Sequence, residues 1–273
     1  MPGRLRSFCR GRTGVRSVTK RAERRREHRS ESRDPSKSRI PWVVGGVFLL
    51  GIGIVGWNLV SSIFDDTVRA PVEVTYGSLQ ELVTLAQGVE EGNPDASVTI
   101  LEFGDYQCPS CQAFFQQVEP FLDLTYIQNN QVSFVFYDFP LVDAHPNAFI
   151  AARAARCAGD QDSYWALHDK LYQTQLEWSL LADPSGEFEG YAEVLGLDEA
   201  AFESCLGSDR HAALVSANIL LGNALGVQGT PTVMVDTGEG RAVQISDYSM
   251  ESIRAVVDAA LARQAAPAAE PTP

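Results

Sequence analysis

Cysteine and histidine are scarce in this chain of 273 residues, which contains five cysteines and four histidines. Only Cys108 and Cys111 are closely spaced, so the chain lacks the second close pair that a zinc ribbon requires. Gln112 stands where covalent haem attachment needs a histidine, which excludes a c-type haem site. Cys108 and Cys111 therefore need an explanation other than a zinc ribbon or a haem attachment site.

Basic residues are also scarce after position 39. The first 39 residues contain 14 of the 22 lysines and arginines and only 4 acidic residues, so the rest of the chain has a net charge of -23. We interpret residues 1–39 as a disordered basic arm, because they contain too few apolar side chains to form a core. An isolated arginine-rich segment is also typical of nucleic-acid binding. The segment that follows favours a topological role, and we expect no nucleic-acid partner.

No formal charge occurs from Ile40 to Phe64, a run of 25 residues. At about 1.5 Å per residue, roughly 20 apolar residues cross the hydrocarbon layer of a membrane, which predicts a transmembrane helix over 40–62. Trp42 and Trp57 lie near its two ends, where indole rings prefer the membrane interface. Basic residues flank only the N-terminal side, so we expect a cytoplasmic N-terminus and a catalytic domain outside the cytoplasmic membrane. The alternative, a cleaved signal peptide, fits poorly with the long arm.

The cysteine count agrees with this topology. Cys9 lies in the predicted cytoplasmic arm, and an even number of cysteines lies outside it: Cys108, Cys111, Cys157 and Cys205. An oxidising compartment permits two disulfides among these four residues.

A strand, a helix and a second strand surround the closely spaced cysteines. Alternating and apolar residues predict strands at 98–103 and 132–139. Between them, apolar residues recur at helical spacing from Cys111 to about Ile127, with a kink expected at Pro120. This order predicts a βαβ unit with a right-handed crossover.

The remaining segments complete an α/β pattern. Residues 63–87 are expected to form a tether and a short helix, and about 146–227 a block of helices. Strands near 231–236 and 242–246 form a predicted hairpin, followed by a last helix. We expect a disordered tail at 265–273.

A C-x-x-C pair at the first turn of a helix is suited to reversible thiol oxidation. Residues three apart on a helix lie close enough for a disulfide after a small adjustment. Cys108 would lie at the helix N-terminus, which lowers a thiol pKa, with Pro109 at the first helical position. Cys111, on the apolar face, would clear a mixed disulfide formed on Cys108. A purely structural bridge is the alternative, although it would add little to a turn that is already helical.

Three segments carry a family resemblance: GNPDASVTILEFGDYQCPSCQAFF, FPLVDAHPNAFIAARAARCAGDQDSYWALHDKLY and GVQGTPTVMVD. Together they resemble the DsbA-like thiol-disulfide oxidoreductases of the thioredoxin superfamily, over about residues 88–264. The resemblance implies a thioredoxin fold, of the α/β class, with an inserted helical domain. In this chain one transmembrane helix would precede that fold.

The resemblance also implies roles for three residues outside the cysteine pair. Glu102, six residues before Cys108, matches a buried acid that helps to move the proton of Cys111. Its alternative is a glutamate at a strand end that reaches solvent. Pro231 matches a cis-proline facing the cysteine pair, and Thr230 before it would pair its backbone with an extended substrate segment.

One position departs from the family pattern. Ser110 stands where strongly oxidising members often carry histidine, so it brings a hydrogen-bond donor but no positive charge. Threonine before the cis-proline also occurs in isomerases and reductases. The direction of electron flow therefore stays open at this stage.

The other cysteines and the histidines have structural interpretations. Cys157 and Cys205 fall where some members of the family carry a second disulfide, and two buried free thiols are the alternative. The histidines of the predicted external domain are interpreted as helix-surface or capping residues: His145, His168 and His211. No spacing argument places one of them beside Cys108, as a Cys-His hydrolase would require.

These observations predict a membrane-anchored enzyme that introduces disulfides into exported, cysteine-containing proteins. Cys108, Cys111 and Glu102 would carry the chemistry, and the expected substrate-binding residues are Pro109, Ser110, Thr230 and Pro231. No cofactor or metal is expected, and a quinone-linked membrane oxidase of DsbB or VKOR type would reoxidise the pair. The alternatives are a reductase or isomerase fed by a transmembrane electron donor, or a copper carrier of the same superfamily. Such a carrier would need a ligand histidine near the final hairpin, and no histidine occurs after His211.

Overall fold

The computed structural model describes residues 67–239 and 242–265. The basic arm, the transmembrane segment predicted at 40–62 and nearly all of the predicted tail lie outside these residues. Among the described helices, none combines the length and the apolar character that crossing a membrane requires. The elements, in chain order, are α2 (Leu79–Leu85), β1 (Val89–Gly92), β2 (Thr99–Gly104), α3 (Pro109–Gln117), α4 (Glu119–Leu122), η1 (Asp123–Ile127), β3 (Ser133–Asp138), α5 (Ala148–Gly159), α6 (Tyr164–Gln173), α7 (Gln175–Trp178), α8 (Ser185–Val194), α9 (Glu199–Leu206), α10 (Ala212–Ala224), β4 (Thr232–Asp236), β5 (Ala242–Gln244) and α11 (Met250–Ala265).

A mixed five-stranded sheet lies at the centre, with the strand order β1-β3-β2-β4-β5. β2 and β3 are parallel, as the predicted βαβ unit requires, and every other pairing is antiparallel. The predicted hairpin is confirmed as β4 and β5. β1 was not predicted, because its sequence VEEG has little strand propensity and forms an edge strand through pairing with β3.

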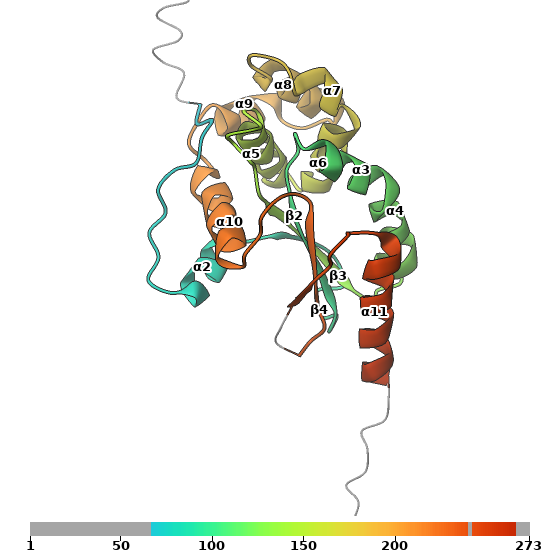
Figure 1. The fold of residues 1–273 in the computed structure, drawn as a ribbon. Coiled ribbons are helices and arrows are strands. Elements are labelled where there is room, and N and C mark those ends of the chain that lie inside the picture. Colours follow the sequence, from blue (N-terminus) through green and yellow to red (C-terminus); the bar gives the residue numbers. More distant parts are fainter. Residues whose placement is uncertain (1–66, 240–241, 266–273) are drawn as a thin grey trace, which may run out of the picture. The chain divides into compact units, whose positions relative to one another are not determined.

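Helices cover both faces of the sheet (Figure 1). α2 and α10 lie on one side of it, and α4 and α11 lie on the other. Successive residues of β2 alternate between these layers: Ile100 belongs to the large core, whereas Leu101 and Phe103 pack with Ile219 of α10. The same alternation places Glu102 on the face of Ile100, below the helix that begins at the cysteine pair.

The helix that follows Cys108 is interrupted rather than simply bent. α3 ends at Gln117, and Val118 between α3 and α4 has φ -115° and ψ -51°. Pro120 lies two residues later and has no N–H to donate to the preceding turn. Helical structure then continues through α4 and η1 to Ile127, so the predicted extent is right while the predicted kink is a break between short segments.

Helices fill the chain between β3 and β4, and Figure 1 shows α5 to α9 gathered at one end of the sheet. α5 is rich in alanine, and eleven of its 12 residues are buried. Because small side chains allow close approach, neighbouring helices pack against α5 on several sides. This block reaches the loop that carries the cysteine pair.

Candidate active site at the start of α3

Cys108 and Cys111 are both free thiols at the N-terminus of α3. Cys108 is the N-cap residue, with extended backbone, and Pro109 is the first residue of the helix. The side chain of Cys108 retains 7% exposure, whereas Cys111 is fully buried. The backbone N–H of Asp105 donates a hydrogen bond to Sγ of Cys111 at 3.5 Å. Only the first sulfur is therefore accessible to another molecule.

The surroundings of Cys108 favour its thiolate. Hydrogen bonds lower its pKa to about 5, the largest contribution coming from the thiol of Cys111, with others from the Thr230 side chain and the backbone N–H groups of Cys111 and Ser110. Burial acts in the opposite direction and does not cancel them. Orphan N–H groups at a helix N-terminus are suited to this purpose. The serine at position 110 contributes through its backbone N–H, which any residue other than proline would supply.

Cys111 has the opposite tendency. Burial raises its pKa well above the ordinary value, and the neighbouring Cys108 and Glu102 raise it further. At neutral pH the reduced pair therefore carries one thiolate, on Cys108, and one proton, on Cys111. Chemistry at Cys111 must include a proton transfer.

Glu102 lies on β2 and is completely buried. Neither of its carboxyl oxygens has a hydrogen-bond partner in the described structure. Burial raises its pKa to about 8; the neighbouring carboxyl group of Glu119 opposes this rise, and Cys108 adds to it. The alternative interpretation, in which this glutamate reaches solvent at a strand end, is wrong.

Gly104 makes room for this arrangement. A Cβ atom at this position would lie 2.3 Å from the ring of Phe136 and 3.1 Å from Oε1 of Glu102. The distance to the Phe136 ring is too short for any side chain, so glycine is required where the strand passes the buried carboxyl group.

Thr230 and Pro231 lie opposite the cysteine pair, before β4. The peptide bond between them is cis. Sγ of Cys108 lies 3.4 Å from the carbonyl oxygen of Thr230. The hydroxyl oxygen of Thr230 is buried and has no hydrogen-bond partner in the described structure, and the threonine side chain helps to lower the pKa of Cys108. Together with the exposed Pro109, these residues border the accessible sulfur.

Glutamine and asparagine side chains connect the cysteine loop to the helical block. Nε2 of Gln175 donates to the carbonyl oxygens of Tyr106, at 2.7 Å, and of Cys108, at 3.0 Å. Gln107 and Asn147 both donate to the carbonyl oxygen of Ser179. Sequence reasoning missed these residues, because nothing in their spacing distinguishes them from ordinary polar positions.

Of the three histidines interpreted as surface or capping residues, His168 does not fit that interpretation. His168 is fully buried among aromatic rings, because α6 turns this position towards the core. His145 is partly buried, and Nδ1 lies 2.7 Å from the buried carboxylate of Asp105, which raises the pKa of the histidine. His211 pairs with Asp160 at 2.9 Å.

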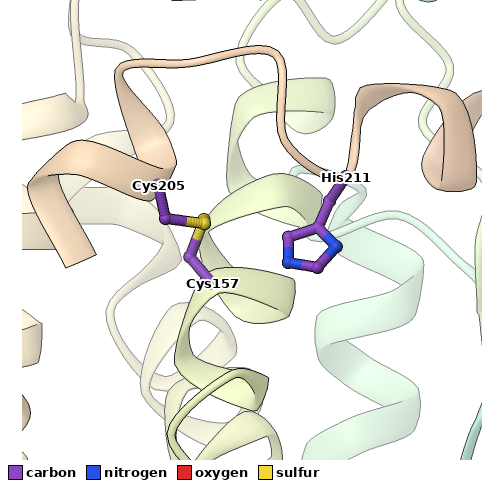
Figure 2. A group of neighbouring side chains, drawn as sticks. All are labelled: Cys157, Cys205 and His211. Atoms are coloured by element: carbon purple, nitrogen blue, oxygen red, sulfur yellow. A yellow bond between two sulfur atoms is a disulfide. The ribbon is translucent and has the colours of Figure 1, made fainter. Parts of the chain in front are cut away.

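Cys157 and Cys205 form a disulfide between α5 and α9, with His211 nearby (Figure 2). The ligand atoms of these three residues lie within 4.8 Å of one another, the spacing of a metal site. Metals bind thiolates, however, and sulfurs joined in a disulfide carry no such charge. Among the described residues, no group of three candidate ligands includes Cys108 or Cys111.

Comparison with protein families gives one family model, Thioredoxin_4, described as thioredoxin, which matches residues 85–259. A probable disulfide bond formation protein D from Bacillus anthracis is 30% identical over 71% of this chain and 86% of the relative. The Na(+)/H(+) antiporter NhaA 1 of Salinispora arenicola is 35% identical over 63% of this chain. The chain spans only 24% of the length of that relative.

The crystal structure of oxidised BdbD from Bacillus subtilis is similar in fold. The TM-score is 0.57, and the alignment covers 66% of this chain and 95% of BdbD with 24% sequence identity. At this identity the likeness concerns the fold alone, and it confirms the thioredoxin-like arrangement of sheet and helices expected from the sequence.

Proposed function

Because this chain belongs to the Thioredoxin_4 family, we propose that it is a DsbA-like thiol-disulfide oxidoreductase that introduces disulfides into exported proteins. Relatives of similar length are named disulfide bond formation proteins, which supports the reaction class. The chemistry would take place at Cys108 and Cys111.

The reaction would proceed by two thiolate attacks. In the oxidised enzyme, a substrate thiolate attacks Sγ of Cys108, the bond between Cys108 and Cys111 breaks, and Cys111 leaves and takes up a proton. A second substrate thiolate then attacks the substrate sulfur of the mixed disulfide and releases Cys108 as a thiolate. The substrate loses two electrons and gains a disulfide, and the enzyme becomes a dithiol.

The observation that carries the oxidase direction is the pKa of Cys108, which lies at about 5 instead of 9. A stabilised thiolate is a good leaving group and stabilises the reduced enzyme relative to its disulfide. Such an enzyme readily transfers its disulfide to a substrate dithiol. Glu102 would supply the proton that Cys111 needs, because its raised pKa allows it to hold and release a proton near neutral pH.

We place the catalytic domain outside the cytoplasmic membrane, anchored by the apolar segment 40–62. Two features support this proposal: the absence of charge from that segment, and the disulfide between Cys157 and Cys205, which persists in an oxidising compartment. Each turnover leaves a dithiol, so a membrane partner must remove two electrons. A quinone-linked oxidase is the expected partner.

A Cys111→Ala variant of the full chain tests this proposal. Without the resolving thiol, mixed disulfides on Cys108 should persist and should be recovered by mass spectrometry with exported proteins of the host. A variant that lacks both cysteines is the matched control and should yield none. Absence of adducts with exported proteins would overturn the proposal.

The reduction potential of the pair separates the oxidase from a reductase or isomerase. An oxidase should have a reduction potential well above that of thioredoxin, which is about -270 mV. A reduction potential close to that of thioredoxin would instead indicate a reductase or isomerase.

A further inference from the structure

Reduction of the disulfide requires a proton at a place that water does not reach. Cys111 takes up this proton, and both Cys111 and Glu102 are fully buried. A substrate bound over Cys108 would cover the accessible side of the pair as well. A route for the proton from another side of the molecule would therefore benefit the reaction.

Glu119, the first residue of α4, lies next to Glu102. Each of the two carboxyl groups shifts the pKa of the other. Two ionised carboxylates carry only acceptors, so both oxygens of Glu102 and Oε1 of Glu119 are buried without a donor. The pair is satisfied only when its members share a proton, which is the property of a proton-transfer pair.

Glu119 also lines a cavity of about 270 Å³ on the side of α4. The cavity lining includes Glu91 and Asp169, which are exposed, so the cavity meets solvent. Glu119 thus lies between the buried carboxyl of Glu102 and a volume large enough for several water molecules. Neither Cys108 nor the substrate-facing Thr230 lines this cavity.

We propose that Glu119 is a positioning residue that relays protons between Glu102 and water in this cavity, and so acts on Cys111 through Glu102. When Cys111 leaves as a thiolate, Glu102 gives it a proton and becomes ionised. Glu119 then takes up a proton from cavity water and passes it to Glu102, so that the pair again holds one proton. Oxidation of the dithiol reverses each transfer, and the inference deepens the proposed function, on which it rests.

Charged and titratable groups from several elements face Glu119. Burial raises the pKa of Glu119 well above its ordinary value, and Glu102 raises it further. His168 acts in the opposite direction, whereas Asp169 adds to the rise. Tyr172 faces it from α6, and the other acids of the cavity are Glu91 and Asp123. This surrounding negative charge keeps a proton on the pair at neutral pH.

A Glu119→Gln variant of the full chain tests the relay, because glutamine keeps the size of the side chain and cannot exchange a proton. The rates of disulfide reduction by dithiothreitol and of reoxidation are measured by rapid mixing across neutral and alkaline pH. We expect both rates to fall about tenfold, with a changed pH profile, while the pKa of Cys108 stays the same. Glu91→Gln, in the same cavity but unpaired with Glu102, is the matched control and should behave as the wild type.

Chemical rescue separates proton relay from a structural role. Glu119→Ala opens space beside Glu102, and added acetate should restore most of the lost rate, whereas chloride at equal ionic strength should not. Equal rates in Glu119→Gln and Glu91→Gln, or no response of Glu119→Ala to acetate, would overturn the relay. Should Glu119→Gln fail to fold, the acetate response of Glu119→Ala decides. A wild-type chain without thiol-disulfide exchange would instead overturn the proposed function.

Discussion

Sγ of Cys108 lies 3.4 Å from the backbone carbonyl oxygen of Thr230, and the side chain of the same threonine, whose buried hydroxyl has no hydrogen-bond partner in the described structure, helps to lower the pKa of Cys108. The loop before β4 thus acts on Cys108 through both backbone and side chain. The side-chain contribution can be removed alone, because valine has nearly the same shape as threonine.

We expect Thr230→Val to raise the pKa of Cys108 from about 5 by about one unit. The reason is the loss of one hydrogen bond to a charged sulfur, worth about 1.5 kcal/mol. The reduced enzyme becomes less stable, so the reduction potential should fall by about 30 mV. Thiolate absorbance followed against pH measures the pKa.

Thr232→Val is the matched control for this change. The hydroxyl of Thr232 donates to the carbonyl oxygen of Gly229 at 2.7 Å instead of contacting Cys108. An equal pKa shift in both variants would contradict a specific role for the Thr230 hydroxyl.

The second prediction concerns how the buried carboxyl group of Glu102 makes the stability of the fold depend on pH. In the folded chain Glu102 keeps its proton up to about pH 8, whereas in the unfolded chain it ionises near 4.5. Its contribution to stability is therefore present below pH 4.5 and is lost as the pH rises through 8. Glu102→Gln, which cannot ionise, should exceed the wild type in unfolding free energy at alkaline pH by about 5 kcal/mol.

Urea unfolding of both reduced proteins in acid and in alkali measures this difference. Glu193→Gln, at an exposed position on α8, controls for replacing a carboxyl group by an amide. A difference between Glu102→Gln and the wild type that is the same at both pH values would contradict the prediction.

Local sequence signals were sufficient for the elements that carry the cysteine pair. Cys108, Pro109 and the apolar spacing after Cys111 determine where α3 begins, and these are properties of neighbouring residues. The parallel pairing of β2 and β3 follows, because a strand, a helix and a strand in sequence favour one arrangement.

The remaining features depend on contacts between distant segments. β1 exists because Glu90 and Glu91 pair with Val135 and Phe134 of β3, which the acidic sequence alone does not suggest. Glu119 resembles any polar helix position, and the burial that raises its pKa comes from distant segments of the chain. Single-sequence patterns do not contain these pairings.

Arg156 supplies a third prediction, because it forms a buried ion pair that sequence reasoning missed. Its Nε and Nη2 atoms lie 2.7 and 2.6 Å from Oδ2 of Asp138. Burial raises the pKa of Asp138 even with this partner present. Arg156→Met should therefore lower the unfolding free energy by about 3 to 5 kcal/mol, because it leaves a buried carboxyl group without its cation.

Arg254 provides the comparison, because its ion pair with Asp258 is exposed to solvent. Nε of Arg254 lies 3.6 Å from Oδ2 of Asp258. Arg254→Met should cost less than about 1 kcal/mol. Urea unfolding of the two variants at neutral pH measures these changes. Equal losses of unfolding free energy would show that the buried pair contributes no more than the surface pair.

The disulfide between Cys157 and Cys205 makes a prediction that separates stability from electron transfer. It closes a loop across 48 positions of the chain, from α5 to α9. Replacing both cysteines by alanine should lower the unfolding free energy by about 4 kcal/mol, because the unfolded chain regains conformational freedom. Thiol-disulfide exchange at Cys108, measured per folded molecule, should stay the same, since neither sulfur of the bridge takes part in turnover. In the wild type, full reduction should produce the same loss of stability, whereas the alanine variant should not respond to reductant in this way. If the alanine variant remained folded and yet lost exchange activity, the bridge would be part of the electron path, and its interpretation as a structural link would be wrong.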